Sequence, residues 1–304
     1  MIGATGTVGA PVAKRLLSDG VAVRLLVRDV DWARAILGRG GASGAQDQYQ
    51  FVAGRLGDRA SLEQALDGCT GVHISVNGGS DPAALERVEL HGTAMVADLA
   101  AEQGLGRLTY VSGFLAREEL AAEHLESRVK LAAERAIAHS GVPFTIFKPT
   151  YFMETLPRHL RGQRAVVIGR HLPPLHLVAG ADFARMVAAA FRTPEAAGRE
   201  LVVHGPQAVT IADALRLYCS IVAPGRRVTT VPLPVMAAVD GWFMGGQLRR
   251  AIALMRLLQR VGELGDPDEA NRLLGAPTTT VAQWCRQQAA AAEAEPDAGA
   301  KGAS

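Results

Sequence analysis

Glycines 3, 6 and 9 lie three residues apart near the start of the chain, directly before a helix-forming segment that contains Pro11. A loop of this kind binds a pyrophosphate, because glycines let backbone N–H groups approach the phosphate oxygens and the helix N-terminus adds partial positive charge. A plain tight turn is the alternative interpretation of the spacing alone. The candidate phosphate-binding residues of the loop are Gly3, Thr5, Gly6, Thr7, Val8 and Gly9.

Arg28 follows the next apolar run, Ala22–Val27, about 20 residues beyond the loop, where a dinucleotide site distinguishes NAD from NADP. An acidic residue there would bind the ribose hydroxyls of NAD, whereas a guanidinium can hold the 2′-phosphate of NADP. Arg28 therefore favours NADP, and the neighbouring Asp29 leaves NAD as the alternative. A solvated arginine without a ligand is the structural alternative.

The elements that would position these residues alternate along the first half of the chain. Short β-branched runs alternate with helix-forming segments, which is typical of βαβ units around a parallel sheet. The expected strands are Ala22–Val27, Gln50–Val52, Gly71–Val76, Leu108–Val111 and Phe144–Phe147. The expected helices are Pro11–Leu17, Ser61–Leu66, Leu85–Ala101 and Glu118–Ala138, with Gly20, Gly104 and Gly141 at helix ends. The fold class that this pattern predicts is α/β, with a Rossmann-type doubly wound parallel sheet.

The alternation becomes irregular in the second half of the chain. We expect a dinucleotide-binding domain over residues 1–150 and a smaller, mainly helical lobe over residues 151–288. A strand at about residues 200–203 is expected to return to the sheet of the first domain. The glycine-rich segment 38–47 is expected to be a mobile loop, and the alanine-, glycine- and acid-rich residues 289–304 are expected to be disordered.

Only Met1 and Ile2 precede the glycine loop, although the strand before such a loop is central in a Rossmann sheet. The absence of about four buried aliphatic residues, each contributing roughly 1.5–3 kcal/mol, is comparable to the net stability of a domain. We therefore expect a truncated first strand and hypothesise that Met1 is an internal residue of a longer natural chain.

Charge and composition argue against several classes of function. The 32 basic and 30 acidic residues give a net charge of +2, which does not indicate binding to nucleic acid or to a membrane surface. Cys69, Cys219 and Cys285 lie far apart without metal-ligand spacing, as is typical of a reducing cytoplasm. No secretory signal is recognised, and prolines interrupt the least charged stretch, Val228–Leu248. We expect a cytoplasmic protein without a stable membrane span.

Further segments carry a resemblance that covers nearly the whole chain. They are Gly3–Gly9, Val27-Arg28-Asp29, Gly57-Asp58-Arg59, Ser61-Leu62, Tyr110-Val111-Ser112, Lys130 with Glu134, Ser140–Pro149 and Phe152-Met153-Glu154. With them the chain resembles the atypical short-chain dehydrogenase/reductases, in particular the NmrA-like NAD(P)H-binding branch. The resemblance implies that Asp58 lies near the adenine and that Lys130 reaches the nicotinamide ribose. It also implies a cofactor-lining segment that includes Val76, Asn77 and Gly78.

One departure from that family concerns the proton donor. Active members carry a tyrosine four residues before the lysine, and this chain has Glu126 there. The tyrosine donates a proton because the lysine and the cofactor lower its pKa. A glutamate four residues before Lys130 is expected instead to form an ion pair on the helix surface. Lys148 replaces the more common arginine before Pro149, a departure to which we attach little weight.

The candidate catalytic residues are Lys130, Ser112 and Tyr151. Ser112 ends an expected strand, where its hydroxyl could bind a substrate carbonyl or simply cap the backbone. Lys130 could donate a proton if burial lowers its pKa, or could only hold the ribose. Tyr151 could supply the missing phenol from another backbone position, or could form a pocket wall.

The histidines do not indicate a metal centre. His171 and His176 flank two prolines and lack the helical spacing of a metal-ligating pair. His73 lies between apolar residues of an expected strand and is interpreted as a core histidine. No metal is predicted.

Two functions remain as hypotheses. The first is an NADP(H)-dependent oxidoreductase that reduces a small, largely apolar carbonyl or enone between the Rossmann domain and the second lobe. The second is a catalytically silent NAD(P)H-binding redox sensor, regulator or assembly subunit, which would bind a protein partner. The substitution of the usual tyrosine by Glu126 supports the second hypothesis.

Overall fold

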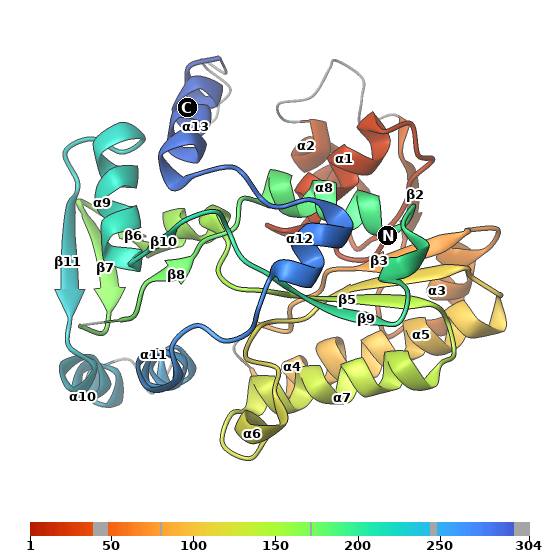
Figure 1. Ribbon diagram of the computed structural model, residues 1–304, viewed down its shortest axis with the longest axis horizontal. Helices are drawn as coiled ribbons and strands as arrows, with labels where there is room; N and C mark the ends of the chain where they lie inside the picture. Colours follow the sequence, from red (N-terminus) through yellow and green to blue (C-terminus); the bar gives the residue numbers. More distant parts are fainter. Residues whose placement is uncertain (39–47, 80, 171, 244–247, 295–304) are drawn as a thin grey trace, which may run out of the picture.

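The computed structural model describes residues 1–38, 48–79, 81–170, 172–243 and 248–294. Its largest sheet is entirely parallel (Figure 1). The strands are β1 (Arg24–Val27), β2 (Gln50–Ala53), β3 (Gly71–Ile74), β4 (Arg107–Val111), β5 (Phe144–Pro149) and β9 (Arg199–Val203). The expected Rossmann-type parallel sheet is confirmed, and the strand Arg199–Val203 pairs with β5 at its edge.

Ile2 joins the two halves of this sheet. It forms isolated parallel bridges to Leu26 of β1 and to Ile74 of β3. Its backbone N–H donates to the His73 carbonyl at 2.9 Å, and its own carbonyl accepts from the Ser75 N–H at 3.0 Å. The strand order is therefore β2-β1-Ile2-β3-β4-β5-β9, and the first strand is reduced to this one bridging residue.

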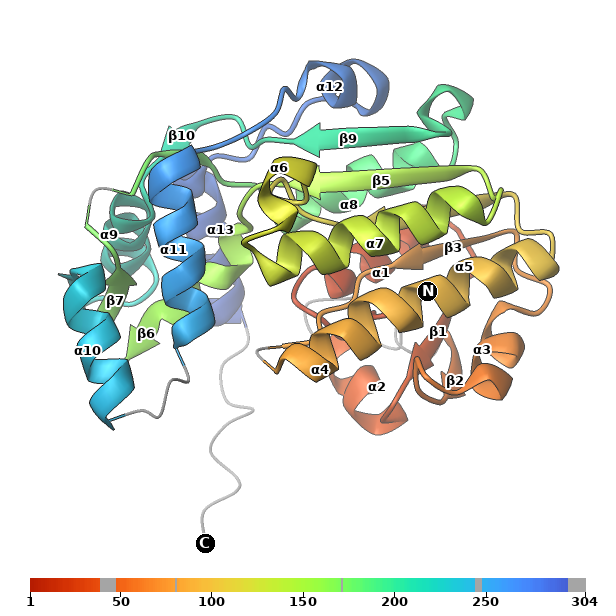
Figure 2. The ribbon, with the colours of Figure 1, turned by 90° about the horizontal axis from the view of Figure 1, so that it is seen from below.

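Helices cover both faces of the sheet (Figure 2). The elements of this half are α1 (Gly9–Ser18), α2 (Val30–Gly38), α3 (Arg59–Leu66), α4 (Pro82–Leu85), the π-helix η2 (Glu86–Gly92), α5 (Thr93–Glu102), α6 (Glu118–Ala121), α7 (Leu125–His139) and α8 (Gly180–Ala190). One apolar core contains residues of α1, α2 and α8, and a second contains residues of α3, α5 and α7. Gly20, Gly104 and Gly141 follow helix ends with positive φ angles, as expected.

Two of the expected long helices depart from a regular α-helix. The segment Leu85–Ala101 contains the π-helical turn η2. The segment Glu118–Ala138 is broken before α7, where His124 has extended backbone angles and its side chain accepts a hydrogen bond from the Ser127 N–H. The prediction of a helix over Leu85–Ala101 is therefore confirmed, with a π-helical stretch inside it, whereas the prediction of a continuous helix over Glu118–Ala138 was wrong, because helix-forming composition does not reveal an extended cap.

The second lobe combines helices with two small sheets, β11-β7-β6 and β10-β8, that the sequence analysis did not predict. Its strands are β6 (Leu160–Arg161), β7 (Arg164–Ile168), β8 (Leu175–His176), β10 (Ala208–Val209) and β11 (Arg227–Val231). Its helices are η3 (Met153–His159), η4 (Pro194–Ala196), α9 (Ile211–Ile221), α10 (Leu233–Phe243), α11 (Arg249–Val261), α12 (Asp268–Leu274) and α13 (Val281–Ala294). β7 pairs with both β6 and β11, and α12 packs against β9 of the main sheet.

The end of the chain departs from its expected disorder. Helix α13 continues to Ala294, so the prediction of disorder from residue 289 was wrong for residues 289–294. Their alanines have the highest intrinsic helix propensity, which composition-based arguments for disorder ignore. Residues 295–304 and the predicted loop segment 39–47 lie outside the described residues. None of the described helices is both long and apolar enough to cross a lipid bilayer.

His73 of β3 gives the fold a pH dependence. The residue is 1% exposed, and its Nδ1 lies 2.8 Å from the Thr109 hydroxyl. Burial lowers the pKa of His73 to about 3. Because the unfolded chain takes up this proton near pH 6.5, stability is full above that pH. It should fall by about 1.4 kcal/mol per unit as the pH decreases towards 3.

We expect the variant His73→Gln to lose about 2 kcal/mol less stability than the wild type between pH 7 and pH 5. Urea unfolding at the two pH values measures this difference. His139→Gln, at an exposed position, should behave as the wild type does. An equal loss of stability in His73→Gln and the wild type would contradict the assignment of this pH dependence to His73.

Candidate functional site

Two glycines of the loop are required by its own packing. Gly3 has a φ of +84°, and a Cβ there would lie 1.9 Å from the Ser75 carbonyl oxygen. A Cβ at Gly9 would lie 2.0 Å from the Gly3 carbonyl oxygen. Gly3 therefore makes the turn out of the sheet, and Gly9 lets α1 begin directly against the loop.

Gly6 lies on the open side of the loop. It is exposed, and the atom nearest to a Cβ there would be the Gly3 oxygen at 3.3 Å. The N-cap residue Val8 makes no side-chain capping bond, and the first turn of α1 contains no acidic residue. Nothing in that turn repels an anion, so the loop fits a dinucleotide pyrophosphate. Across the loop, the Arg158 guanidinium donates to the Thr7 hydroxyl at 2.5 Å.

Arg28 and Asp29 have different roles after β1. The Asp29 carboxylate accepts a hydrogen bond from the Trp32 N–H at 2.9 Å, and thereby caps the start of α2. Arg28 is exposed. Asp58 is also exposed, at the N-cap position of α3, and its side chain makes no capping bond.

Lys130 of α7 forms an ion pair with Glu89, which the sequence analysis missed. The Nζ lies 2.8 Å from the Glu89 carboxylate, whose side chain is completely buried. The other carboxylate oxygen accepts from the Gly78 N–H at 2.9 Å, so Glu89 ties the predicted cofactor-lining segment to Lys130. Glu89 lies in η2, and a π turn changes the direction in which a helical side chain points.

The neighbours of Lys130 raise its pKa. Burial alone would lower its pKa, but the neighbouring Tyr110, Glu89 and Glu126 outweigh burial and raise the pKa above its ordinary value. A pKa lowered by burial, which was one of the two alternatives for Lys130, is not found, because the nearby carboxylates of Glu89 and Glu126 favour the charged ammonium. The raised pKa favours the charged ammonium form of Lys130 near pH 7.

Ser112 belongs to a second buried network. Its hydroxyl donates to the Glu134 carboxylate, whose other oxygen lies 3.0 Å from the Lys148 Nζ. Lys148 also donates to the Ala116 carbonyl at 3.1 Å and pairs with Glu200 of β9 at 2.7 Å. Lys148, to which the sequence analysis gave little weight, thus ties β5 to α7 and to the edge strand.

Tyr151 lies just beyond β5 and contacts His159. The His159 Nδ1 lies 2.9 Å from the Val166 carbonyl, which can only accept, so this nitrogen carries the proton. The His159 Nε2 must then accept the hydrogen bond of 2.9 Å from the Tyr151 hydroxyl. Burial raises the pKa of Tyr151 and lowers that of His159, so both are neutral near pH 7.

Residues 3–194 match a protein-family model described as NAD(P)H-binding. The chain belongs to this NAD(P)H-binding family. The match includes the glycine loop, Arg28, Lys130 and Tyr151, and it confirms the resemblance to the NmrA-like, atypical short-chain dehydrogenase/reductase group.

Proteins similar in sequence to this chain include reductases and an assembly factor. The chain is 33% identical over 214 residues to (4-alkanoyl-5-oxo-2,5-dihydrofuran-3-yl)methyl phosphate reductase of Streptomyces griseus, covering 69% of each protein. It is 27% identical to the photosystem II assembly factor Ycf39 of Cyanophora paradoxa, covering 77% of this chain and 71% of that protein. Its fold is similar to that of an NADPH-dependent quinone oxidoreductase of Escherichia coli complexed with NADPH. That structure has a TM-score of 0.70 and 22% identity, with 94% of this chain and 98% of the other covered.

Proposed function

We propose that this protein is an NADP(H)-dependent reductase of the cytoplasm. Its proposed substrate is a small, largely apolar molecule in which a carbon–carbon double bond is conjugated to a carbonyl group. When bound, NADPH supplies the hydride. The observation that carries the proposal is that the three candidate catalytic residues are all engaged within the protein: Ser112 with Glu134, Lys130 with Glu89, and Tyr151 with His159.

The engaged donors favour a conjugated substrate over a simple ketone. Hydride addition to a ketone produces an alkoxide, which requires a proton from a nearby acid. Hydride addition to the β-carbon of an enone moves the electron pair onto the carbonyl oxygen, and the resulting enolate is delocalised. Water can then protonate the α-carbon, so the reaction balances without a proton from a side chain.

In this proposal the site residues bind or position the cofactor and the substrate. Lys130 holds the ribose hydroxyls through its ammonium group, and Glu89 holds Lys130 in place. Ser112 and Tyr151 are positioning residues at the ends of β4 and β5. The name of the Streptomyces relative describes a substrate whose ring double bond is conjugated to two carbonyl groups, which supports a conjugated substrate, although that compound also carries a phosphate group.

Paired substrates test the proposal. We expect NADPH oxidation with an acyl butenolide to be at least about 100-fold faster than with its saturated ketone analogue, since a missing general acid costs about 10²–10⁴-fold. Ser112→Ala and Tyr151→Phe should retain activity within about tenfold. Equal rates with both substrates, or a loss of about 100-fold or more in either variant, would overturn the proposal.

The preference for NADP depends on Arg28 in this proposal. Asp29 is already used to cap α2, whereas Arg28 is exposed at the end of β1. Because hydrogen bonds to charged groups contribute about 1.5–3 kcal/mol, Arg28→Ala should weaken NADPH binding about 10–100-fold and leave NADH binding unchanged. Fluorescence titration with both cofactors measures the effect. Arg216→Ala, an exposed arginine of α9, is the control. An equal loss of affinity for NADPH and NADH would contradict the assignment of the NADP preference to Arg28.

A second candidate function is an assembly or regulatory role without turnover. Glu126 occupies the position of the usual catalytic tyrosine, and α10 exposes apolar side chains to solvent. Trp242 is 83% exposed and Val235 is 51% exposed, which suits contact with a protein partner. Tight NADPH binding without oxidation of NADPH by butenolides, quinones or ketones would favour this function over the first.

A further inference from the structure

Arg158 of the second lobe lies against the glycine loop of the first. Its guanidinium donates a hydrogen bond to the Thr7 hydroxyl at 2.5 Å, and the two residues are 151 positions apart in the chain. Thr7 directly precedes Val8, the N-cap residue of α1. The guanidinium is therefore held beside the end of a helix whose free N–H groups already carry partial positive charge.

The short helix η3 directs Arg158 towards the loop. A 3₁₀ helix has three residues per turn, so Met153, Leu156 and His159 share one face of η3. Met153 and Leu156 are buried in the apolar core of the second lobe. Arg158 lies off this face and is exposed. The burial of the apolar face thus sets the direction in which the Arg158 side chain leaves the helix.

Glu154 anchors the start of the same helix. Its carboxylate accepts hydrogen bonds from the Gly180 N–H at 2.8 Å and from the Trp284 indole N–H at 3.0 Å. Gly180 begins α8, and a Cβ there would lie 3.1 Å from the Pro11 Cγ in the first turn of α1. Because η3, α8 and α1 pack together beside the loop, the position of Arg158 is built into the fold.

The positive charge of Arg158 is not balanced by a neighbouring carboxylate. Among the described residues it forms no ion pair, and the first turn of α1 contains no acidic residue. A cation next to a helix N-terminus is unfavourable, because both carry positive charge. An anion bound between them would remove this repulsion. A phosphate group suits both partners, since backbone N–H groups and a guanidinium each bind phosphate oxygens.

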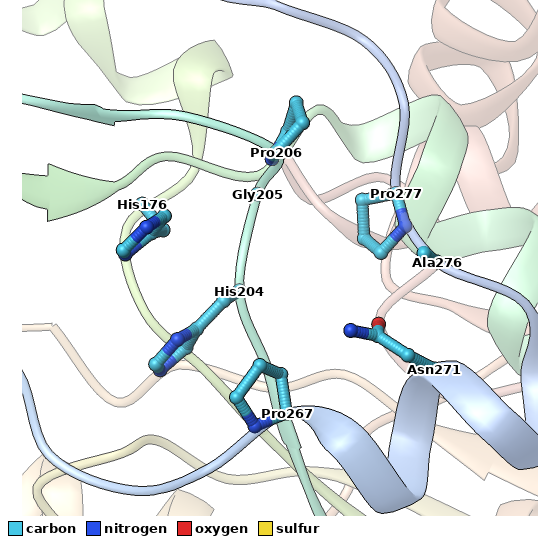
Figure 3. Close-up of a pocket in the computed structure, with 8 residues that line it drawn as sticks. All are labelled: His176, His204, Gly205, Pro206, Pro267, Asn271, Ala276 and Pro277. Carbon is cyan, nitrogen blue, oxygen red and sulfur yellow. The ribbon is translucent and has the colours of Figure 1, made fainter.

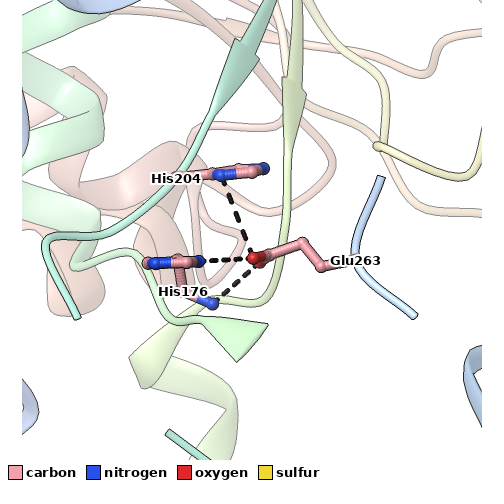
Figure 4. A group of neighbouring side chains, drawn as sticks. All are labelled: His176, His204 and Glu263. Carbon is pink, nitrogen blue, oxygen red and sulfur yellow. Dashed lines mark hydrogen bonds and ion pairs between the residues drawn. The ribbon is translucent and has the colours of Figure 1, made fainter. Parts of the chain in front are cut away.

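Another polar cluster of the second lobe, near the end of β9, is different in charge. There the Glu263 carboxylate accepts a hydrogen bond from the His176 backbone N–H at 2.7 Å and lies 3.9 Å from the His204 Nδ1 (Figure 4). The residues that line the adjoining cavity of about 330 Å³ include neither arginine nor lysine (Figure 3). This cavity therefore offers no permanent cation to a phosphate group, and β3, β4 and β5 separate β9 from Ile2 at the start of the loop.

We propose that Arg158 binds the pyrophosphate of NAD(P)H and thereby completes the cofactor site from the second lobe. The glycine loop provides backbone N–H groups, and the guanidinium adds charged donors. The role differs from that of Arg28, because NADPH and NADH share the pyrophosphate but not the 2′-phosphate. The inference rests on the NAD(P)H binding of the family and does not require the proposed reduction. The sequence did not indicate Arg158, because it lies far from the glycine loop along the chain.

Titration of the full chain with NADPH, NADH and ADP-ribose tests the proposal. ADP-ribose carries the pyrophosphate but no nicotinamide. We expect Arg158→Ala to weaken the binding of all three ligands about 10–100-fold, because it removes hydrogen bonds to a charged group. Arg158→Lys keeps the charge but loses the planar fork of donors, so it should lose less affinity than Arg158→Ala. Arg216→Ala, at the exposed arginine of α9, should bind all three ligands as the wild type does.

Melting temperatures separate cofactor binding from a structural role of Arg158. Without cofactor, Arg158→Ala should melt no lower than the wild type, since it removes a cation from a helix N-terminus. At one fixed NADPH concentration, the melting temperature of the variant should rise less than that of the wild type. Unchanged affinity in Arg158→Ala, a loss confined to NADPH, or a clearly lower melting temperature without cofactor would overturn the proposal. None of these results would contradict the proposed reduction, which the paired substrates test separately.

Discussion

Replacing Lys130 with methionine is expected to lower the free energy of unfolding by about 3–5 kcal/mol. Methionine has a similar length but no charge, so the variant leaves the Glu89 carboxylate buried without its ion-pair partner. The Gly78 N–H still donates to this carboxylate, but one backbone hydrogen bond does not replace a cation at 2.8 Å. Urea unfolding of the variant and the wild type measures the difference.

A double variant separates the unpaired charge from the loss of packing. Adding Glu89→Gln to Lys130→Met removes the charge while an amide oxygen still accepts from Gly78, so most of the lost stability should return. Arg59→Met, which breaks exposed ion pairs with Glu63 and Glu102, should change stability little. If the double variant is as unstable as Lys130→Met, the destabilisation arises from packing and the ion pair is not its cause.

The parts of the fold that the sequence predicted depend on local patterns. Each expected strand of the main sheet is a short apolar run, and β1 to β5 lie within a few residues of the predicted ranges. The glycine loop was equally predictable, because the spacing of its glycines alone indicates a turn followed by a helix. Local patterns did not predict β7 and β11, because their pairing joins segments that α8, β9 and α9 separate along the chain.

The partners of the candidate site residues were less predictable than the residues themselves. Lys130 was identified from the sequence, but its partner Glu89 lies on another helix and is directed by a π turn. The available signal was only a glutamate between the apolar residues Val88 and Leu90 of an expected helix. Buried charges are seldom left unpaired, so such a residue predicts a partner without identifying it.

Alanine substitutions in the glycine loop should separate folding from cofactor binding. Gly6→Ala should fold as the wild type does, because the nearest atom to the new Cβ is a carbonyl oxygen at 3.3 Å on the open side of the loop. Its NADPH affinity should fall at least about tenfold, because the methyl group occupies the space through which the backbone approaches the pyrophosphate. Melting temperatures with and without NADPH measure both effects.

Gly3→Ala should show the opposite pattern. A left-handed conformation costs alanine about 1–2 kcal/mol, and the Cβ at 1.9 Å from the Ser75 oxygen forces the loop away from β3. Gly20→Ala measures the cost of the left-handed conformation alone, because Gly20 has a φ of +78° with no atom within 4 Å of the added Cβ. We therefore expect Gly3→Ala to lower the melting temperature without NADPH clearly more than Gly20→Ala does. If Gly6→Ala keeps wild-type NADPH affinity, the open side of this loop is not where the pyrophosphate binds.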